Sequence, residues 1–223
     1  MRRRGFTVLE AALVLLILSF LTLAIFGLFS MGSRGFQHAV MRSGLQGDAR
    51  RVGALLERDF HLTHWATIGV VERTVSFEGL TVHRDAVVCH GLSDWSNPAN
   101  FINGISPRWD RYIVFYATQE QGPARLVHQK VEPGGTLPNM LPYPALGVNI
   151  DDEPKYNNDV YSTGILSQSV LSFMVEKDEA DQLLNVSVKF RGRGRKAIQT
   201  EKEVDETHEV VYSLRALNTF PEL

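Results

Sequence analysis

The fold of this chain is decided by the stretch Arg3-Arg4-Gly5-Phe6-Thr7-Val8-Leu9-Glu10-Ala11 and by the apolar run that follows it. Residues 11–33 contain no Asp, Glu, Lys, Arg or His and consist mostly of Leu, Ile, Val, Ala and Phe. At about 1.5 Å of rise per residue, this run makes a helix about 34 Å long, which is enough to cross a hydrocarbon core of about 30 Å. The sequence therefore predicts a membrane-spanning helix over residues 6–33.

The residues before this run indicate how the chain is oriented in the membrane. Arg2, Arg3 and Arg4 do not cross a bilayer easily, so we expect residues 1–5 to stay cytoplasmic and the rest of the chain to be exported. A cleaved secretory signal has a shorter apolar region followed by a small-x-small site, whereas this run is longer and no Ala-x-Ala follows it. We therefore expect a single-pass inner-membrane protein with its carboxy-terminal domain in the periplasm or outside the cell.

The order of basic leader, Gly5-Phe6, Glu10 and apolar run resembles the class III leader of type IV prepilins and type II secretion pseudopilins. The resemblance implies that residues 1–5 are a leader, that a prepilin peptidase cuts after Gly5, and that the new amino terminus of Phe6 is methylated. It also implies that Glu10, five residues into the mature chain, meets the amino terminus of a neighbouring subunit. The implied partners are the peptidase, other minor and major pilins or pseudopilins, an inner-membrane assembly platform and the lipid bilayer.

Physical chemistry gives each leader residue a reason for its place. Gly5 has no side chain, so the peptide bond after it can enter a narrow protease cleft in extended form. Glu10 lies in the first helical turn, where the positive end of the helix dipole favours a carboxylate. A local interpretation is also open, because Thr7-Val8-Leu9-Glu10 is a capping-box pattern, and one glutamate can cap the free subunit and pair in a filament.

After residue 33 the apolar positions recur mostly every three to five residues, which predicts that the helix continues as an amphipathic segment over residues 34–62. These positions are Phe36, Val40, Leu45, Val52, Leu55, Leu56 and Phe60. Six glycines within the helix predict a weakly helical middle, either for a stalk that bends or for close helix packing in the membrane. The segment Leu55-Leu56-Glu57-Arg58-Asp59-Phe60 resembles the stalk end of J-type minor pseudopilins and W-type minor pilins.

From about residue 68 the pattern changes to short strands rich in β-branched residues, separated by turns. The predicted strands are 68–71, 74–77, 80–82, 86–89, 112–116, 124–131, 170–175, 184–190 and 209–217. A long helix packed on antiparallel sheet is an α+β architecture, with residues 63–223 as one globular β-rich domain. The order of these strands also resembles the J and W classes, which implies the pilin fold.

Composition narrows the function classes. The formal charge of −2 gives no excess of positive charge for a polyphosphate backbone, so no dedicated nucleic-acid partner is predicted. The single cysteine, Cys89, cannot form an intramolecular disulfide, and neither the sequence motifs of hydrolases nor those of nucleotide-binding enzymes occur. Cys89 and His90 are adjacent in a predicted strand and so point to opposite faces, which predicts a buried structural cysteine.

Three other groups of residues were considered as binding sites. The seven histidines are scattered, and His61 and His64 are expected to cap the helix end or lie on the surface rather than bind metal. Residues 149–159 gather oxygen ligands suited to calcium, but Pro154 and Lys155 interrupt their spacing, so a solvated acidic loop is expected. The run Arg191-Gly192-Arg193-Gly194-Arg195-Lys196 is expected to be a charged hairpin loop, with a nucleic-acid contact as the alternative.

The sequence thus predicts a structural assembly subunit without enzyme activity or cofactor. Its role would be to initiate or tip a type IV pilus or a type II secretion pseudopilus. The alternative from another class is an extracytoplasmic enzyme or ligand-binding domain held by an uncleaved signal anchor.

Overall fold

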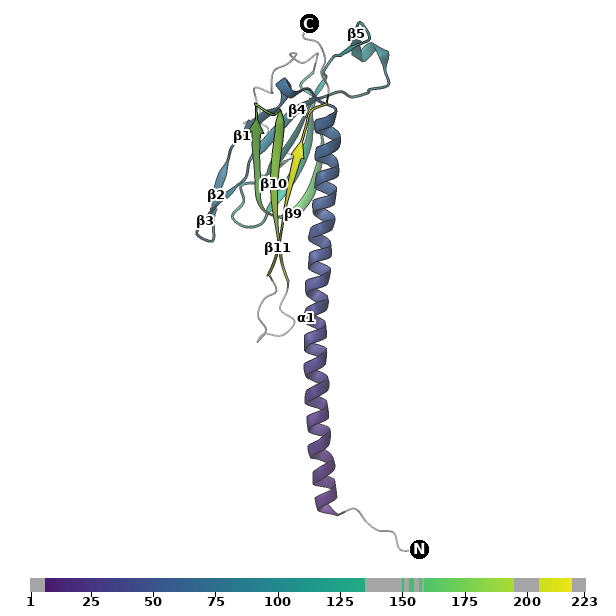
Figure 1. Cartoon of the computed structure of the whole chain (residues 1–223), viewed down its shortest axis with the longest axis vertical. Coiled ribbons are helices and arrows are strands. Elements are labelled where there is room, and N and C mark those ends of the chain that lie inside the picture. The colour runs from purple at the N-terminus through teal and green to yellow at the C-terminus, as the bar shows by residue number, and fades with distance from the viewer. Residues whose placement is uncertain are drawn as a thin grey trace.

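A computed structural model describes residues 7–134, 150, 153–154, 157, 159–194 and 205–217. One continuous helix, α1 (Val8–His61), runs from the amino-terminal end into the domain, as the sequence predicted. It projects far below the globular part as a straight stalk (Figure 1). The glycines do not interrupt the helix, because its hydrogen-bonded pattern is regular through all of them.

Only the last third of α1 packs on the domain. The buried stripe is formed by Leu45, Ala49, Val52, Leu56 and Phe60, at intervals of three and four residues. The predicted stripe was wrong at its start, because Phe36 is 71% exposed and Val40 is 53% exposed. The cause is the length of the sheet, which reaches down the helix only to the level of Met41 and His38.

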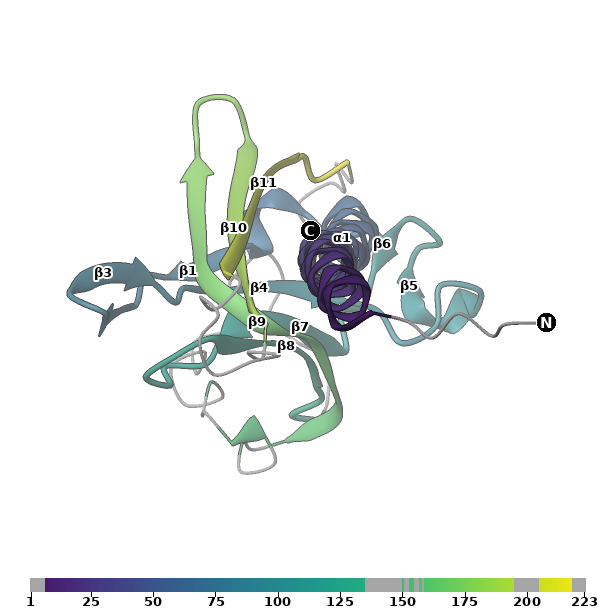
Figure 2. The same cartoon turned by 90° about the horizontal axis from the view of Figure 1, so that it is seen from below.

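A curled, antiparallel sheet forms the body of the domain (Figure 2). In the described residues it contains seven strands in the order β1-β4-β7-β8-β9-β10-β11. Their bounds are β1 (Gly69–Val71), β4 (Ala86–Gly91), β7 (Arg111–Ala117), β8 (Ala124–Val131), β9 (Val160–Asp178), β10 (Leu183–Arg193) and β11 (Asp205–Leu214). The fold is therefore α+β. Each predicted strand coincides with an observed one, with differences at the ends: Ile68 lies outside β1, and β11 begins before Glu209 and ends before Arg215.

The long strand β9 produces the curl of the sheet. Its first part pairs with β8 and its second part pairs with β10, so one strand passes from one half of the sheet to the other. Register shifts between Ala124 and Val127 and between Lys189 and Phe190 accompany the bend. Such irregularities increase the local twist, which accounts for the curl of the sheet.

The sheet is buried on both faces near its centre. The face toward α1 carries Val87, Cys89 and Phe115, which pack with the helix stripe. The opposite face carries Val88 and Tyr116 and is covered by residues of the 91–111 segment, including Trp109. Burial on both sides explains why β4 has no exposed residue and reads in the sequence as a continuous apolar run.

Short elements complete the domain. They are two 3-10 helices, η1 (Trp65–Thr67) and η2 (Pro98–Asn100), and two small hairpin sheets, β2 (Thr74–Phe77) with β3 (Leu80–His83) and β5 (Phe101–Ile102) with β6 (Ser106–Pro107). The β2–β3 hairpin projects from the side of the sheet away from α1 (Figure 2).

Two buried charged residues that are adjacent in the chain, Arg84 and Asp85, connect the β2–β3 hairpin to the main sheet. The Arg84 side chain is fully buried and donates to the carbonyl oxygens of Val170 and Gly122, at 2.9 and 2.7 Å, and also to that of Leu171. Asp85 accepts hydrogen bonds from the backbone N–H of Val175 at 2.9 Å and from Arg73. These contacts satisfy polar groups that would otherwise be buried at a cost of a few kcal/mol each.

Candidate assembly interface along the N-terminal helix

Glu10 closes the amino-terminal end of α1. Its Oε2 accepts hydrogen bonds from the backbone N–H and from the Oγ1 of Thr7, each at 2.9 Å, and Thr7 Oγ1 in turn accepts from the Glu10 N–H at 3.3 Å. This is the reciprocal capping box that the sequence pattern allowed. Both side chains are exposed. The other predicted leader residues, Arg2, Arg3, Arg4, Gly5 and Phe6, lie outside the described residues.

The first half of α1 exposes apolar side chains around its whole circumference. The large apolar side chains from Val8 to Val40 are between 53% and 88% exposed, with Leu15, Leu16 and Ile17 at 63%, 57% and 56%. A soluble protein rarely presents so much contiguous apolar surface to water, so this half needs lipid or protein around it. By length and composition the helix could cross a membrane.

Two hydroxyl groups of this half form hydrogen bonds within the helix. Ser19 Oγ donates to the Leu15 carbonyl oxygen at 2.7 Å, and Thr22 Oγ1 donates to that of Leu18 at 2.8 Å. These bonds remove the need for water at the two hydroxyls. In the sequence of residues 7–33, Glu10 is the only residue with a charged side chain. It lies at the end of an otherwise apolar surface.

Polar contacts fix the stalk to the sheet at two heights. His38 Nδ1 lies 2.6 Å from Glu206 Oε1, at the start of β11. Higher up, Ser167 Oγ donates to Asp48 Oδ2 at 2.5 Å, and the Tyr212 hydroxyl donates to the Ala49 carbonyl oxygen at 2.6 Å. The helix and the domain are therefore held as one unit over the upper part of the stalk.

Asp59 forms a buried ionic cluster near the top of the helix. Its carboxylate is 5% exposed and lies 2.7 Å from Arg58 Nε and 3.1 Å from His128 Nε2. Burial raises the pKa of Asp59, but hydrogen bonds from His128 and Arg58 lower it by more, so the net pKa lies below its ordinary value of 3.8. Asp59 was not predicted from the sequence as a buried, paired residue.

The signal that could have found Asp59 is its position on the helix. It lies three residues after Leu56 and seven after Val52, on the same stripe that is buried against the sheet. A carboxylate on a buried stripe predicts a cationic or hydrogen-bonding partner on the facing strand. His128 of β8 supplies it.

The prediction of a buried cysteine is confirmed by the position of Cys89. Cys89 is fully buried on the face toward α1, and burial raises the pKa of its thiol well above the ordinary value. His90 lies on the other face against the rings of Trp109 and Tyr112. The two side chains therefore do not meet, and Cys89 remains a thiol packed in the core.

Metal chemistry is not supported by the geometry of the described residues. Within them, no group of three or more His, Cys, Asp or Glu side chains is placed to hold a metal ion. His61 lies in the last turn of α1, and His64 caps η1 by accepting from the Ala66 N–H at 3.2 Å. Both histidines thus lie where the sequence placed them, at the helix end.

The candidate calcium loop is described only in part. Asn149, Asp151, Asp152 and Asn158 lie outside the described residues. The buried Asn157 uses its amide to donate to Gln129 Oε1 at 2.8 Å and to the Tyr116 hydroxyl at 3.1 Å. Glu153 lies 3.5 Å from Arg125. These two side chains are therefore engaged with the protein itself.

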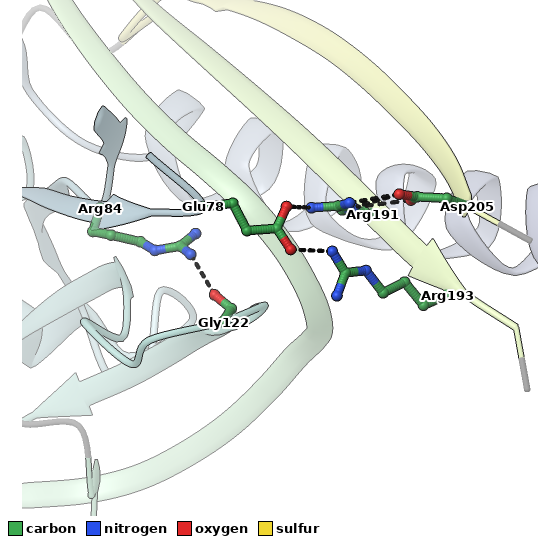
Figure 3. Close-up of polar contacts among 6 residues, drawn as sticks. All are labelled: Glu78, Arg84, Gly122, Arg191, Arg193 and Asp205. Carbon is green, nitrogen blue, oxygen red and sulfur yellow. Dashed lines mark hydrogen bonds and ion pairs between the residues drawn. The ribbon is translucent and has the colours of Figure 1, made fainter. Parts of the chain in front are cut away.

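The prediction of a hairpin loop for the basic run was wrong at Arg191 and Arg193. Both belong to β10, and both contact the same carboxylate, Glu78 in the turn between β2 and β3 (Figure 3). Arg191 also contacts Asp205 of β11, with Nη2 2.5 Å from Oδ2. Two carboxylates thus neutralise two guanidinium groups, which disfavours a phosphate contact here. The rest of the run, Arg195 and Lys196, lies outside the described residues.

Arg84 lies in the same region but has a different role. It is buried and donates to the Gly122 carbonyl oxygen, whereas Glu78, Arg191 and Arg193 contact one another in a separate surface cluster (Figure 3). Arg84 therefore supports the sheet, whereas the surface cluster fastens the tip of the β2–β3 hairpin to the start of β11.

Comparison of the chain with models of protein families, with curated proteins and with solved structures gives no match. The functional argument therefore depends on the residues and geometry of the chain itself.

Proposed function

We propose that this chain is a minor pilin or pseudopilin, a structural subunit that initiates or tips the assembly of a type IV pilus or a type II secretion pseudopilus. The observation that carries the proposal is the continuous helix α1, which presents an apolar, unpacked half with Glu10 at its end and carries the domain on its other half. The leader sequence before it supports the same conclusion. In this proposal the domain has the pilin fold.

Such a helix is suited to the assembly of subunits into a filament. In the membrane, lipid surrounds the apolar half of α1, and in a filament the corresponding halves of neighbouring subunits replace the lipid. Burial of each large apolar side chain contributes roughly 1.5–3 kcal/mol relative to water, so the free half cannot remain in water. The stalk would thus pass from one apolar environment to another without exposure.

Glu10 would supply the electrostatic part of assembly. A carboxylate within hydrocarbon costs about 2.5–3.5 kcal/mol on insertion scales and calls for a positive partner. The amino terminus of a neighbouring subunit, freed by cleavage after Gly5 and methylated at Phe6, is the partner that the leader resemblance implies. Pairing the two would neutralise both charges in the filament core.

In this proposal the leader arginines stay cytoplasmic and the domain lies in the periplasm or outside the cell. A prepilin peptidase processes the chain, and an inner-membrane assembly platform and other pilins or pseudopilins receive it. Enzyme activity is not part of the proposal. The signal-anchored enzyme or binding domain gains no support from the described residues, because the polar clusters there are internally paired.

Intact-mass spectrometry of the mature protein tests the processing step. We expect loss of residues 1–5 and the addition of one methyl group at Phe6. A chain that keeps its first five residues, or that is cut by a secretory signal peptidase beyond the apolar run, would refute the proposal and favour the signal anchor.

A pair of variants separates the two roles of Glu10. Glu10→Ala should leave cleavage intact but abolish incorporation into filaments. Thr7→Val removes the hydroxyl of the capping box and keeps the carboxylate, so incorporation should persist. If Thr7→Val blocks incorporation as completely as Glu10→Ala, Glu10 acts as a helix cap and the pairing role is wrong.

A further inference from the structure

The strand β11 forms one long edge of the main sheet. It spans ten residues and pairs with β10 on one side only, and in the described part of the chain no strand pairs with its outer side. The opposite edge, β1, has three residues. A long edge strand offers a row of backbone donors and acceptors to another chain, and proteins usually shorten or cover such an edge.

The direction of β11 relative to the stalk is fixed by two contacts. Glu206 meets His38, and Tyr212 meets Ala49, so the strand and the helix run the same way. The two contacts are separated by about 16 Å along the helix and about 20 Å along the strand, which agree within a modest tilt. The edge therefore follows the stalk, as Figure 1 also shows.

A groove lies between the helix and this edge. Two adjoining hollows of about 420 and 270 Å³, which share Arg50 and Tyr212, extend along the flank of α1. The residues that line them are Gln46, Ala49, Arg50, Gly53, Ala54, Glu57 and His61 of the helix, and His208, Val210, Tyr212, Ser213 and Leu214 of the strand. Gly53 has no side chain, and the Tyr212 ring lies directly against it at this point of the groove.

We propose that the free edge of β11 and the α1–β11 groove bind an extended segment of a different protein chain. The added strand would continue the sheet, and its inner side chains would lie in the groove over Val210 and Tyr212. Its outer side chains would alternate between cationic and apolar residues. This recognition mode uses main-chain hydrogen bonds for affinity and alternate side chains for specificity.

The outer face of β11 sets the chemistry of the segment. The Glu209 side chain is 55% exposed, and its ion pair with Lys189 is long, at 3.7 Å between Oε2 and Nζ. Val211, two residues on, is 61% exposed. Because residues two apart lie on the same face of a strand, a partner with Lys or Arg opposite Glu209 and a β-branched residue opposite Val211 fits both.

Antiparallel pairing with a second copy of this chain is excluded by the direction of the stalk. Two copies of β11 paired in the antiparallel way used throughout this sheet would be related by a two-fold axis. Since β11 and α1 run the same way, their stalks would then point in opposite directions. Both apolar halves could not enter one bilayer, a step that rests on the membrane anchoring in the proposed function.

Peptide binding to the full chain in detergent micelles tests this inference by fluorescence anisotropy. The probe is a capped peptide that matches β11 in length, with threonine at every second position and lysine and valine alternating at the others. A second peptide carries glutamate in place of lysine, and a third carries N-methyl groups on alternate backbone amides. We expect the lysine peptide to bind, the glutamate peptide to bind roughly threefold to tenfold more weakly, and the N-methylated peptide not to bind.

A charge reversal on the strand gives the decisive comparison. Glu209→Lys should exchange the preference between the lysine and glutamate peptides. Glu176→Lys makes the same change on the same face of the interior strand β9, and it should leave the preference intact. Equal binding of the N-methylated peptide, or an unchanged preference in Glu209→Lys, would overturn the inference.

Sedimentation of the same preparations tests whether a second copy of this chain binds the β11 edge instead. A dimer that Glu209→Lys alters would show that a second copy binds the edge, and the inference of a different chain would be wrong. None of these measurements requires leader removal, so their failure is distinguishable from a failure of the intact-mass test of the proposed function.

Discussion

Replacing Gly53 by alanine should destabilise the domain, although the same change normally stabilises a helix. Alanine in an exposed helix interior is favoured over glycine by about 1 kcal/mol. At Gly53, however, an added Cβ would lie 2.5 Å from Cε1 of Tyr212 and 3.2 Å from Cδ1 and Cζ. The ring must therefore move, and its hydroxyl bond to the Ala49 carbonyl oxygen is lost.

The magnitude follows from three contributions. Overpacking costs about 1–3 kcal/mol, and the lost hydrogen bond costs about 1 kcal/mol. Subtracting the helix-propensity gain leaves a net loss of about 1–3 kcal/mol. Gly47→Ala is the matched control, because nothing lies within 4 Å of its added Cβ, and it should gain about 1 kcal/mol.

Urea unfolding of the full chain in micelles, followed by tryptophan fluorescence, measures both changes. All three tryptophans, Trp65, Trp95 and Trp109, lie in the globular domain, so the signal reports its unfolding. In a Tyr212→Ala background, Gly53→Ala should become stabilising, which would give a coupling free energy of about 2–4 kcal/mol. If Gly53→Ala stabilises the unaltered chain as Gly47→Ala does, the packing of Tyr212 on the helix is refuted.

Three further predictions concern the core. The lowered pKa of Asp59 stabilises the fold above its ordinary value of 3.8, and this contribution is lost as the pH falls through the lower folded value. Asp59→Asn should therefore be less stable at neutral pH by about 1–3 kcal/mol, with a smaller further loss on acidification in urea titrations. Arg84→Met leaves buried carbonyl groups without their donor and should cost at least ~3 kcal/mol by the same assay, which a near-neutral result would contradict. Leu56→Ala, at a fully buried helix position, should cost about 2–5 kcal/mol, and a loss below about 1 kcal/mol would contradict close packing of α1 on the sheet.

The stalk and the strands could be predicted from the sequence because each has a recognisable local pattern of apolar residues. Residues 11–33 and the spacing of Leu45, Val52, Leu56 and Phe60 predicted one helix, and the β-branched runs predicted the strands. The point where the sheet begins to cover the helix could not be predicted. It depends on how far β11 descends beside α1, which is a contact between residues more than 160 positions apart.

The basic run shows a different kind of error. Glycines between arginines were read as a loop, yet Arg191 and Arg193 are two residues apart and so share one face of a strand. That period-two signal was present in the sequence. Their partner, Glu78, was not predictable, because it is brought to them by the turn of another hairpin, where Glu78 itself has a positive φ of 51°.

The two interpretations of Glu10 that the sequence left open are compatible in the structure. The capping box uses only Oε2, which accepts both hydrogen bonds from Thr7. Within the described residues, Oε1 accepts no hydrogen bond, and a carboxylate offers about four acceptor positions in all. A cation could therefore approach Oε1 while the cap stays closed, so capping holds the carboxylate at the helix end without using up its capacity to pair. For this reason the loss of the Thr7 hydroxyl should be tolerated in assembly, whereas the loss of the Glu10 charge should not.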